Sequence, residues 1–107
     1  QWTEAQEIEG LLASRGTGLI FKHSTRCPIS SSAYRELESF RRVRPDVPTY
    51  VVLVVEQRPI SSAIASSTGI PHASPQALLV RDGRVVWHAS HGAITRKSLE
   101  EAWVSSA

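Results

Sequence analysis

The sequence predicts an α/β fold in which helices flank a central mixed β-sheet. Apolar residues recur at helical spacing in several stretches, and short apolar or β-branched runs separate these stretches. The resulting order of elements is α-β-α-β-α-β-β-α. A helix between two strands places them parallel, whereas a tight turn places them antiparallel, so one sheet is expected to contain both arrangements. A chain of 107 residues can bury one core, and we expect a single domain over residues 1–107.

The first half of the chain alternates helix and strand. A capping-box pattern at Thr3 starts a helix over residues 3–15, and the apolar run 19–21 predicts a strand that is buried on both faces. Apolar side chains then recur every three or four positions over residues 28–42, which predicts an amphipathic helix. The β-branched run 49–55 is typical of a central strand. The two strands are joined through a helix and should therefore be parallel.

The second half predicts a short helix, a hairpin and a final helix. Residues 59–67 begin with proline and precede a glycine, as helices often do. Residues 77–81 and 84–89 flank Asp82-Gly83, which is the strongest short-range hairpin signal, so these strands should pair antiparallel. A threonine N-cap then starts a helix over residues 95–103.

Charge and hydropathy exclude two classes of partner. Twelve basic and ten acidic residues give a net charge of only +2. The cluster Arg41-Arg42-Val43-Arg44 lies where a predicted helix ends, and cations there face the negative end of the helix dipole. We therefore expect no nucleic-acid partner. No apolar run approaches the roughly 20 residues that cross a bilayer, so no membrane association is expected either.

Cys27 is the single cysteine, and it cannot form an internal disulfide. Small secreted domains usually carry an even number of cysteines, so we expect a reducing compartment, the cytoplasm. The residue lies between a predicted strand and the first turn of a predicted helix, where free backbone N–H groups and the helix dipole favour a thiolate. Arg26 adds a cation, and Pro28 suits a first helical turn. A buried, inert cysteine is the alternative, but the flanking serines and threonine do not resemble the wall of a core.

Other polar residues near this position allow less specific hypotheses. In Cys27-Pro28-Ile29-Ser30, Ser30 stands where a Cys-x-x-Cys motif holds its second thiol. Lys22 and His23 alternate along the incoming strand, so we expect one to face the site and the other to face solvent. His88 and His91 have a spacing that a metal pair could use, but on a strand and its loop they should point to opposite faces. We therefore expect no metal site.

Several segments together resemble the monothiol bacilliredoxins over about residues 18–96. These segments are Phe21–Ser30, Arg58-Pro59, His72–Gln76, Asp82-Gly83 and Trp87–His91. The resemblance implies a thioredoxin-like fold. It also implies reduction of mixed disulfides between proteins and bacillithiol, the glucosamine-bearing thiol that some bacteria use in place of glutathione.

The resemblance also implies roles for individual residues. Cys27 is expected to be catalytic, with Pro28, Ile29 and Ser30 supporting its thiolate. Arg26 is expected to support the thiolate by its charge, and here the sequence departs from the family, in which a smaller polar residue such as threonine is expected. Bacillithiol would act as co-substrate, with no permanently bound cofactor. The expected partners are S-bacillithiolated proteins, together with a second bacillithiol or a disulfide reductase that regenerates the thiol. A cis bond between Ser74 and Pro75 is expected to face the cysteine, so that the backbone of Ser74 pairs with an extended stretch of the partner.

Two alternatives stay open at this point. Monothiol thioredoxin-like proteins can pair to hold an iron–sulfur cluster between one cysteine each and two small-thiol ligands, and the chain would then be a carrier rather than an enzyme. Pro28 argues against this function, because glycine usually follows the cysteine in that glutaredoxin group. The small thiol itself could instead be glutathione or coenzyme A.

Overall fold

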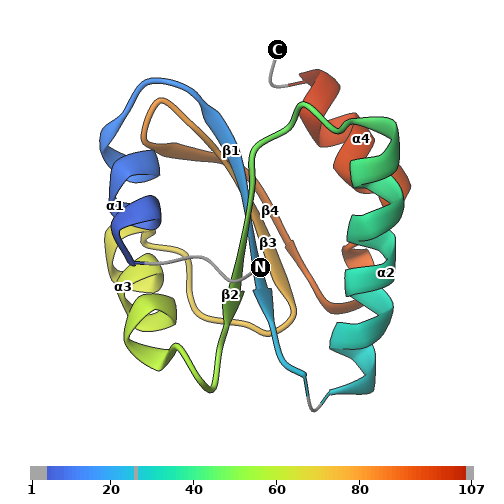
Figure 1. Cartoon of the computed structure of the whole chain (residues 1–107), viewed down its shortest axis with the longest axis horizontal. Helices are drawn as coiled ribbons and strands as arrows, with labels where there is room; N and C mark the ends of the chain where they lie inside the picture. The colour runs from blue at the N-terminus through green and yellow to red at the C-terminus, as the bar shows by residue number, and fades with distance from the viewer. Residues whose placement is uncertain (1–4, 26, 106–107) are drawn as a thin grey trace.

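The chain folds into a sheet with helices on both faces (Figure 1). The structure is a computed structural model, which describes residues 5–25 and 27–105. Helices α1 and α3 cover one face of the sheet, and helices α2 and α4 cover the other (Figure 1). The helices are α1 (Ala5–Ala13), α2 (Pro28–Val43), α3 (Arg58–Thr68) and α4 (Arg96–Ser105), with a 3₁₀ turn η1 (His91–Ala93) before the last. Over these residues, the helices lack the length and the continuous apolar character of a membrane-spanning segment.

The sheet has four strands in the order β2-β1-β3-β4. They are β1 (Thr17–His23), β2 (Thr49–Leu53), β3 (Gln76–Arg81) and β4 (Arg84–Ser90). Strand β1 pairs parallel with β2 and antiparallel with β3, and β3 pairs antiparallel with β4. In the β3–β4 turn, Asp82 and Gly83 both have positive φ, as a two-residue hairpin of this hand requires. The predicted mixed sheet and hairpin are confirmed.

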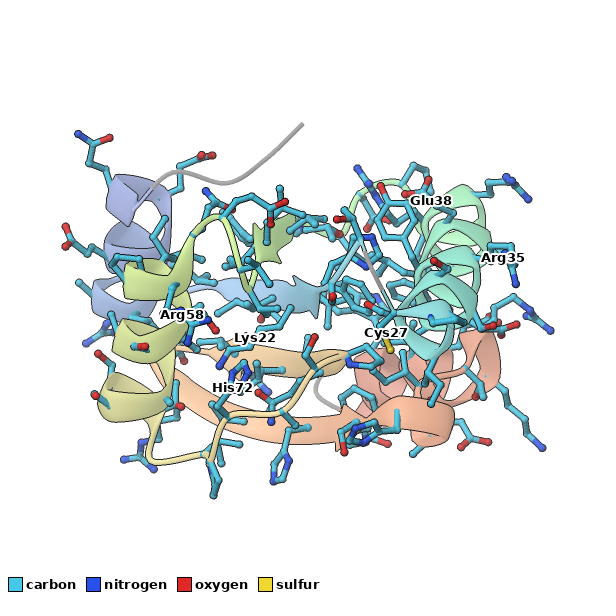
Figure 2. All side chains as sticks on the ribbon, turned by 90° about the horizontal axis from the view of Figure 1, so that it is seen from below. Lys22, Cys27, Arg35, Glu38, Arg58 and His72 are labelled. Atoms are coloured by element: carbon cyan, nitrogen blue, oxygen red, sulfur yellow. The ribbon has the colours of Figure 1, made fainter. Side chains whose placement is uncertain are left out.

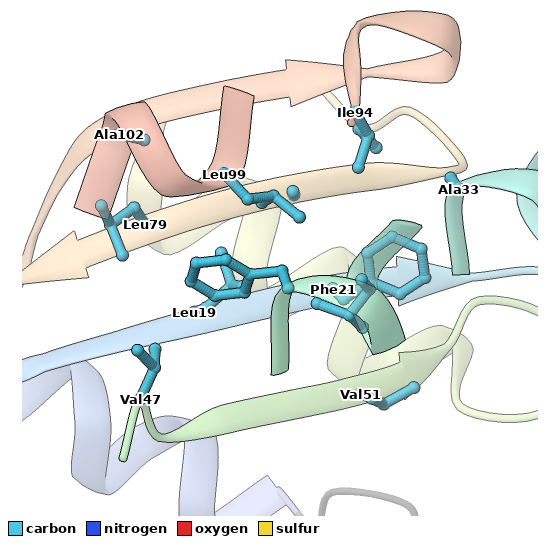
Figure 3. Close-up of a cluster of buried hydrophobic side chains, with 12 residues drawn as sticks. Leu19, Phe21, Ala33, Val47, Val51, Leu79, Ile94, Leu99 and Ala102 are labelled. Atoms are coloured by element: carbon cyan, nitrogen blue, oxygen red, sulfur yellow. The ribbon is translucent and has the colours of Figure 1, made fainter. Parts of the chain in front are cut away.

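Two apolar cores lie on opposite faces of the sheet, and β1 contributes to both. Leu19 and Phe21 point to the face that α2 and α4 cover, where they pack with Leu37 and Leu99 (Figure 3). Ile20 points to the other face and packs among residues of α1 and α3. This alternation is the period-2 pattern of a strand, and both faces are covered. The prediction of a strand buried on both sides is therefore confirmed.

Several boundaries differ from the predicted ones. Helix α1 ends at Ala13, two residues before the predicted end, and the predicted start at Thr3 lies outside the described residues. Strand β1 is longer than the apolar run, because its ladder with β3 extends from Thr17 to Lys22. Strand β2 ends at Leu53, and the following valines belong to the turn that leads into α3. Apolar composition alone therefore overestimated β2.

The predicted caps of α3 and α4 are present. Gly69 ends α3 with φ 74°, a left-handed conformation that glycine adopts without a Cβ clash. At α4, the Ser98 backbone N–H donates to Thr95 Oγ1, and the Thr95 N–H donates to Ser98 Oγ, each at 3.0 Å. This reciprocal pair satisfies N–H groups that the first turn of a helix leaves free.

Candidate active site

Cys27 is the N-cap of α2, directly after the loop that leaves β1. Its backbone is extended, with φ −111° and ψ 121°, and its carbonyl accepts the first helical hydrogen bond, from Ser31 N at 3.1 Å. The thiol is free and partly exposed, and Pro28 occupies the first helical turn. The first-turn N–H groups have no partners within the helix, and the positive end of the dipole lies at this terminus. The predicted placement of Cys27 and Pro28 is confirmed.

Ser30 occupies the position that a second thiol would take, and it is fully buried. Its Oγ lies 2.8 Å from His23 Nδ1 and accepts a hydrogen bond from Ser24 N at 2.9 Å. One hydroxyl therefore ties the first turn of α2 to the end of β1. This bridging role fixes the loop that carries Cys27.

His23 lies beneath the first turn of α2 rather than in solvent. The imidazole stacks on the Tyr34 ring with centroids 4.8 Å apart and planes 23° from parallel. Burial lowers the pKa of His23 below its ordinary value, and the Glu56 carboxylate partly opposes this shift. The group that contacts Ser30 is therefore a neutral imidazole near pH 7.

Two expectations about neighbouring residues were wrong. Neither Lys22 nor His23 faces solvent: they are 0% and 7% exposed, because β1 is an inner strand with helices on both faces. Ile29 is the first of the apolar side chains that recur at helical spacing over residues 28–42 and was therefore expected on the buried face of the helix, yet it is 51% exposed. Ser30 takes the buried position instead, since its hydroxyl is needed by His23 and Ser24. Ile29 therefore lies beside Cys27 on the surface.

The loop before β3 lies at the same edge of the sheet as Cys27. Parallel strands β1 and β2 end at this edge, and antiparallel β3 begins there (Figure 2). The Ser74-Pro75 bond in this loop is cis, as expected. The Pro75 carbonyl accepts a hydrogen bond from His91 N at 3.1 Å. Ser74 Oγ is buried and has no hydrogen-bond partner in the described part of the chain.

The remaining predicted site residues divide into two groups. Arg26 lies outside the described residues, so its support of the thiolate stays a prediction. His88 and His91 are both exposed. Within residues 5–25 and 27–105, no group of three histidine, cysteine, aspartate or glutamate side chains could hold a metal ion.

A second polar cluster, which was not predicted from the sequence, lies at this edge on the α3 side. Lys22 Nζ lies 3.3 Å from His72 Nδ1, and Ser61 Oγ lies 3.2 Å from the same nitrogen. Burial lowers the pKa of Lys22 below 10.5. One signal was available: a lysine that continues an apolar strand predicted to be buried on both faces. His72 and Ser61, however, are brought to it only by the fold.

The family-model comparison decides the relationship of the chain. The model for "Monothiol bacilliredoxin BrxC" matches residues 1–99. The chain belongs to the monothiol bacilliredoxin family. The resemblance drawn from the motif segments is thus confirmed, and a thiol redox role follows for this bacilliredoxin.

Solved structures place the bacilliredoxin on the thioredoxin fold. A structure described as having a thioredoxin fold shares 34% sequence identity, with a TM-score of 0.86 over 94% of this chain and 89% of that one. Fasciola hepatica thioredoxin shares 16% identity, with a TM-score of 0.75 over 96% and 94% of the two chains. Mitochondrial thioredoxin 3 from Saccharomyces cerevisiae shares 18%, with a TM-score of 0.71 over 94% and 88%. The last two show the fold alone, and the predicted thioredoxin-like fold is confirmed.

Proposed function

We propose that this bacilliredoxin removes bacillithiol from protein mixed disulfides by thiol–disulfide exchange through Cys27. The observation that carries the proposal is the arrangement at the start of α2. Cys27 is the only sulfur-bearing residue of the chain, it is partly exposed at the helix N-cap, and a buried serine stands where a resolving thiol would be. Such a site can accept one thiol but cannot expel it by an internal second attack.

The exchange proceeds in two balanced steps. The Cys27 thiolate attacks the bacillithiol sulfur of the mixed disulfide, a new S–S bond forms, and the protein leaves as a thiolate that takes a proton from water. Cys27 then carries bacillithiol. The thiolate of a second bacillithiol attacks the bound bacillithiol sulfur, which releases Cys27 as thiolate and yields bacillithiol disulfide. A disulfide reductase that supplies two electrons is the other route of regeneration.

Docking of the protein partner is proposed to use the backbone beside the thiol. Ser74 precedes β3 at the edge where Cys27 lies, so its peptide groups can pair with an extended stretch of the partner. Backbone pairing ignores side-chain identity, which suits an enzyme that meets many S-bacillithiolated proteins. Arg26 is proposed to support the thiolate, and the cytoplasm is the proposed compartment.

The proposal is tested with a model protein that carries one bacillithiol in a mixed disulfide. Intact mass should show loss of bacillithiol from that protein and transient gain of one bacillithiol on Cys27. Cys27→Ser should abolish both changes, whereas Ser32→Ala, an exposed change on the same helix, should retain them. Equal rates with glutathione or coenzyme A adducts would contradict bacillithiol as the substrate. A stable visible iron–sulfur spectrum after anaerobic reconstitution would favour the carrier function instead.

A further inference from the structure

A buried cation lies at the edge of the sheet that carries Cys27, on the opposite face of β1 from the thiol. Lys22 is completely buried, and its ammonium contacts His72 Nδ1 at 3.3 Å. The same imidazole nitrogen lies 3.2 Å from Ser61 Oγ in α3. Figure 2 looks onto this edge, with Lys22, His72 and Arg58 on one side and Cys27 on the other. An ammonium and a hydroxyl therefore both contact the His72 imidazole, and the guanidinium of Arg58 lies nearby.

This cluster has no counter-ion among the described residues. The ion pairs Arg41–Glu38 and Arg96–Glu100 lie on helices α2 and α4, which cover the opposite face of the sheet. Burial lowers the pKa of His72, and the positive charges of Lys22 and Arg58 lower it further. The acidic residue nearest to Arg58 along the chain, Glu56, acts on His23. Buried ammonium groups are normally paired, so this one lacks the partner that would offset its desolvation.

A small cavity opens beside the cluster at the N-terminal end of α3. It has a volume of about 130 Å³ and is lined by Val54, Val55, Arg58, Ser61, Ser62 and His72. We call it the α3 pocket. Its polar lining consists of a guanidinium, two hydroxyls and an imidazole, at the positive end of an 11-residue helix. Its volume lies below the roughly 300–1,000 Å³ of pockets that hold whole small molecules, which suits the end group of a ligand.

We infer that the small thiol exchanged at Cys27 carries a carboxylate group and that the α3 pocket binds it. The inference rests on the proposed function, because that function brings a small thiol to this edge in every cycle. Arg58 offers a planar pair of donors that matches a carboxylate, the two serines add hydroxyl donors, and Lys22 supplies the buried charge behind His72. The pocket therefore selects among small thiols by a charged group distant from the reacting sulfur.

The binding test uses the Cys27→Ser protein, so that redox chemistry plays no part. Malonate is titrated while NMR follows the His72 imidazole, with malonamide as the uncharged control. Malonate should produce a saturable shift at millimolar concentration, and malonamide should not. Arg58→Gln and Lys22→Met should each weaken binding at least tenfold. Arg84→Gln is the matched control, since Arg84 is an exposed arginine at the opposite end of the sheet, and it should change nothing.

The binding test has outcomes that overturn the inference. An absent malonate shift, or one that persists in Arg58→Gln, would overturn the pocket. Lys22→Met replaces a buried cation with an apolar chain of similar length, so it should fold and show a higher Tm. If it fails to fold, Arg58→Gln alone decides, because that side chain is exposed.

The kinetic test links the pocket to the small thiol. With the bacillithiol-bearing model protein as substrate and bacillithiol as reductant, malonate should raise the KM of the native protein for bacillithiol at least threefold without changing kcat, and it should not do so in Arg58→Gln. Malonate that binds without altering KM would overturn the assignment to the small thiol. Malonate binding in a protein with no exchange activity at all would refute the proposed function and leave the pocket in place.

Discussion

The last two residues of β1 lie next to each other in the chain and end in opposite environments. His23 points toward α2, where Ser30 bonds its Nδ1 and Tyr34 stacks on its ring. Lys22 points toward α3, where its ammonium contacts His72. Both side chains are buried. His23 thus has a hydrogen-bond partner and a stacking partner, whereas Lys22 is a cation without an anionic partner among the described residues.

This difference separates two tasks at one sheet edge. The α2 side holds the loop of Cys27 by a network in which the hydroxyl of Ser30 serves two neighbours, so its purpose is to fix geometry. The α3 side has unmatched positive charge beside a cavity, which costs stability and creates affinity for an anion. Because successive side chains of β1 point to opposite faces of the sheet, His23 can serve the α2 side and the adjacent Lys22 the α3 side.

The largest expected effect comes from removing the thiol on the α2 side. Cys27→Ser should reduce exchange to the uncatalysed rate, because the chain holds no other sulfur. Folding should be unaffected, since the side chain is partly exposed and hydrogen-bonds no other side chain in the described structure. The measurement is turnover of a bacillithiol mixed disulfide together with far-UV circular dichroism. Residual turnover above the uncatalysed rate would remove Cys27 from the centre of the mechanism.

A matched serine pair tests the two sides directly. Ser30→Ala should lower the free energy of unfolding by about 1–3 kcal/mol, because buried His23 Nδ1 and the Ser24 N–H lose a shared partner. Ser61→Ala should cost less than about 1 kcal/mol, because His72 Nδ1 keeps its contact with Lys22. Urea denaturation measures both. Equal costs would show that the two networks do not differ as described.

The smallest expected effect is a pH dependence that differs between the two sides. The folded pKa of Lys22 lies below 10.5, so as the pH falls below 10.5 the unfolded state binds its proton first and stability decreases. The folded pKa of His23 lies below 6.5, so the same loss begins only as the pH falls below 6.5.

The free energy of unfolding should therefore rise toward pH 10.5 in the native protein and rise less in Lys22→Met. In His23→Phe, the change should instead be a shallower loss of stability on the acid side of pH 6.5. Thermal unfolding across both ranges gives the two slopes. Identical pH profiles for the native protein and Lys22→Met would mean that this lysine is not desolvated.

The sequence predicted the elements of the fold because their signals are local. The Asp82-Gly83 turn, the Thr95 cap and the proline after Cys27 each act within a few residues, and each is present. Boundaries were less accurate where pairing decides them, as at β2, which stops when its ladder with β1 stops at Leu53. Local pattern thus determines which elements form, and tertiary pairing determines their length.

The candidate site was predictable on one side only. Cys27 and Ser30 belong to one short motif, so their spacing was visible in the chain. The cluster beside the α3 pocket joins Lys22, Ser61 and His72, which come from a strand, a helix and a loop. No periodicity connects such distant positions. The burial of Lys22 required knowledge that β1 is an inner strand with helices over both faces.

The inner position of β1 also determines how often this strand, which precedes Cys27, unfolds locally. Hydrogen bonds hold β1 on both edges, to β2 and to β3, and core side chains cover both of its faces. Its amide protons can meet deuterated solvent only when the sheet itself separates, so they should be among the slowest to exchange. Cys27 follows this strand after a loop of a few residues. It is therefore anchored to a segment that local breathing does not reach.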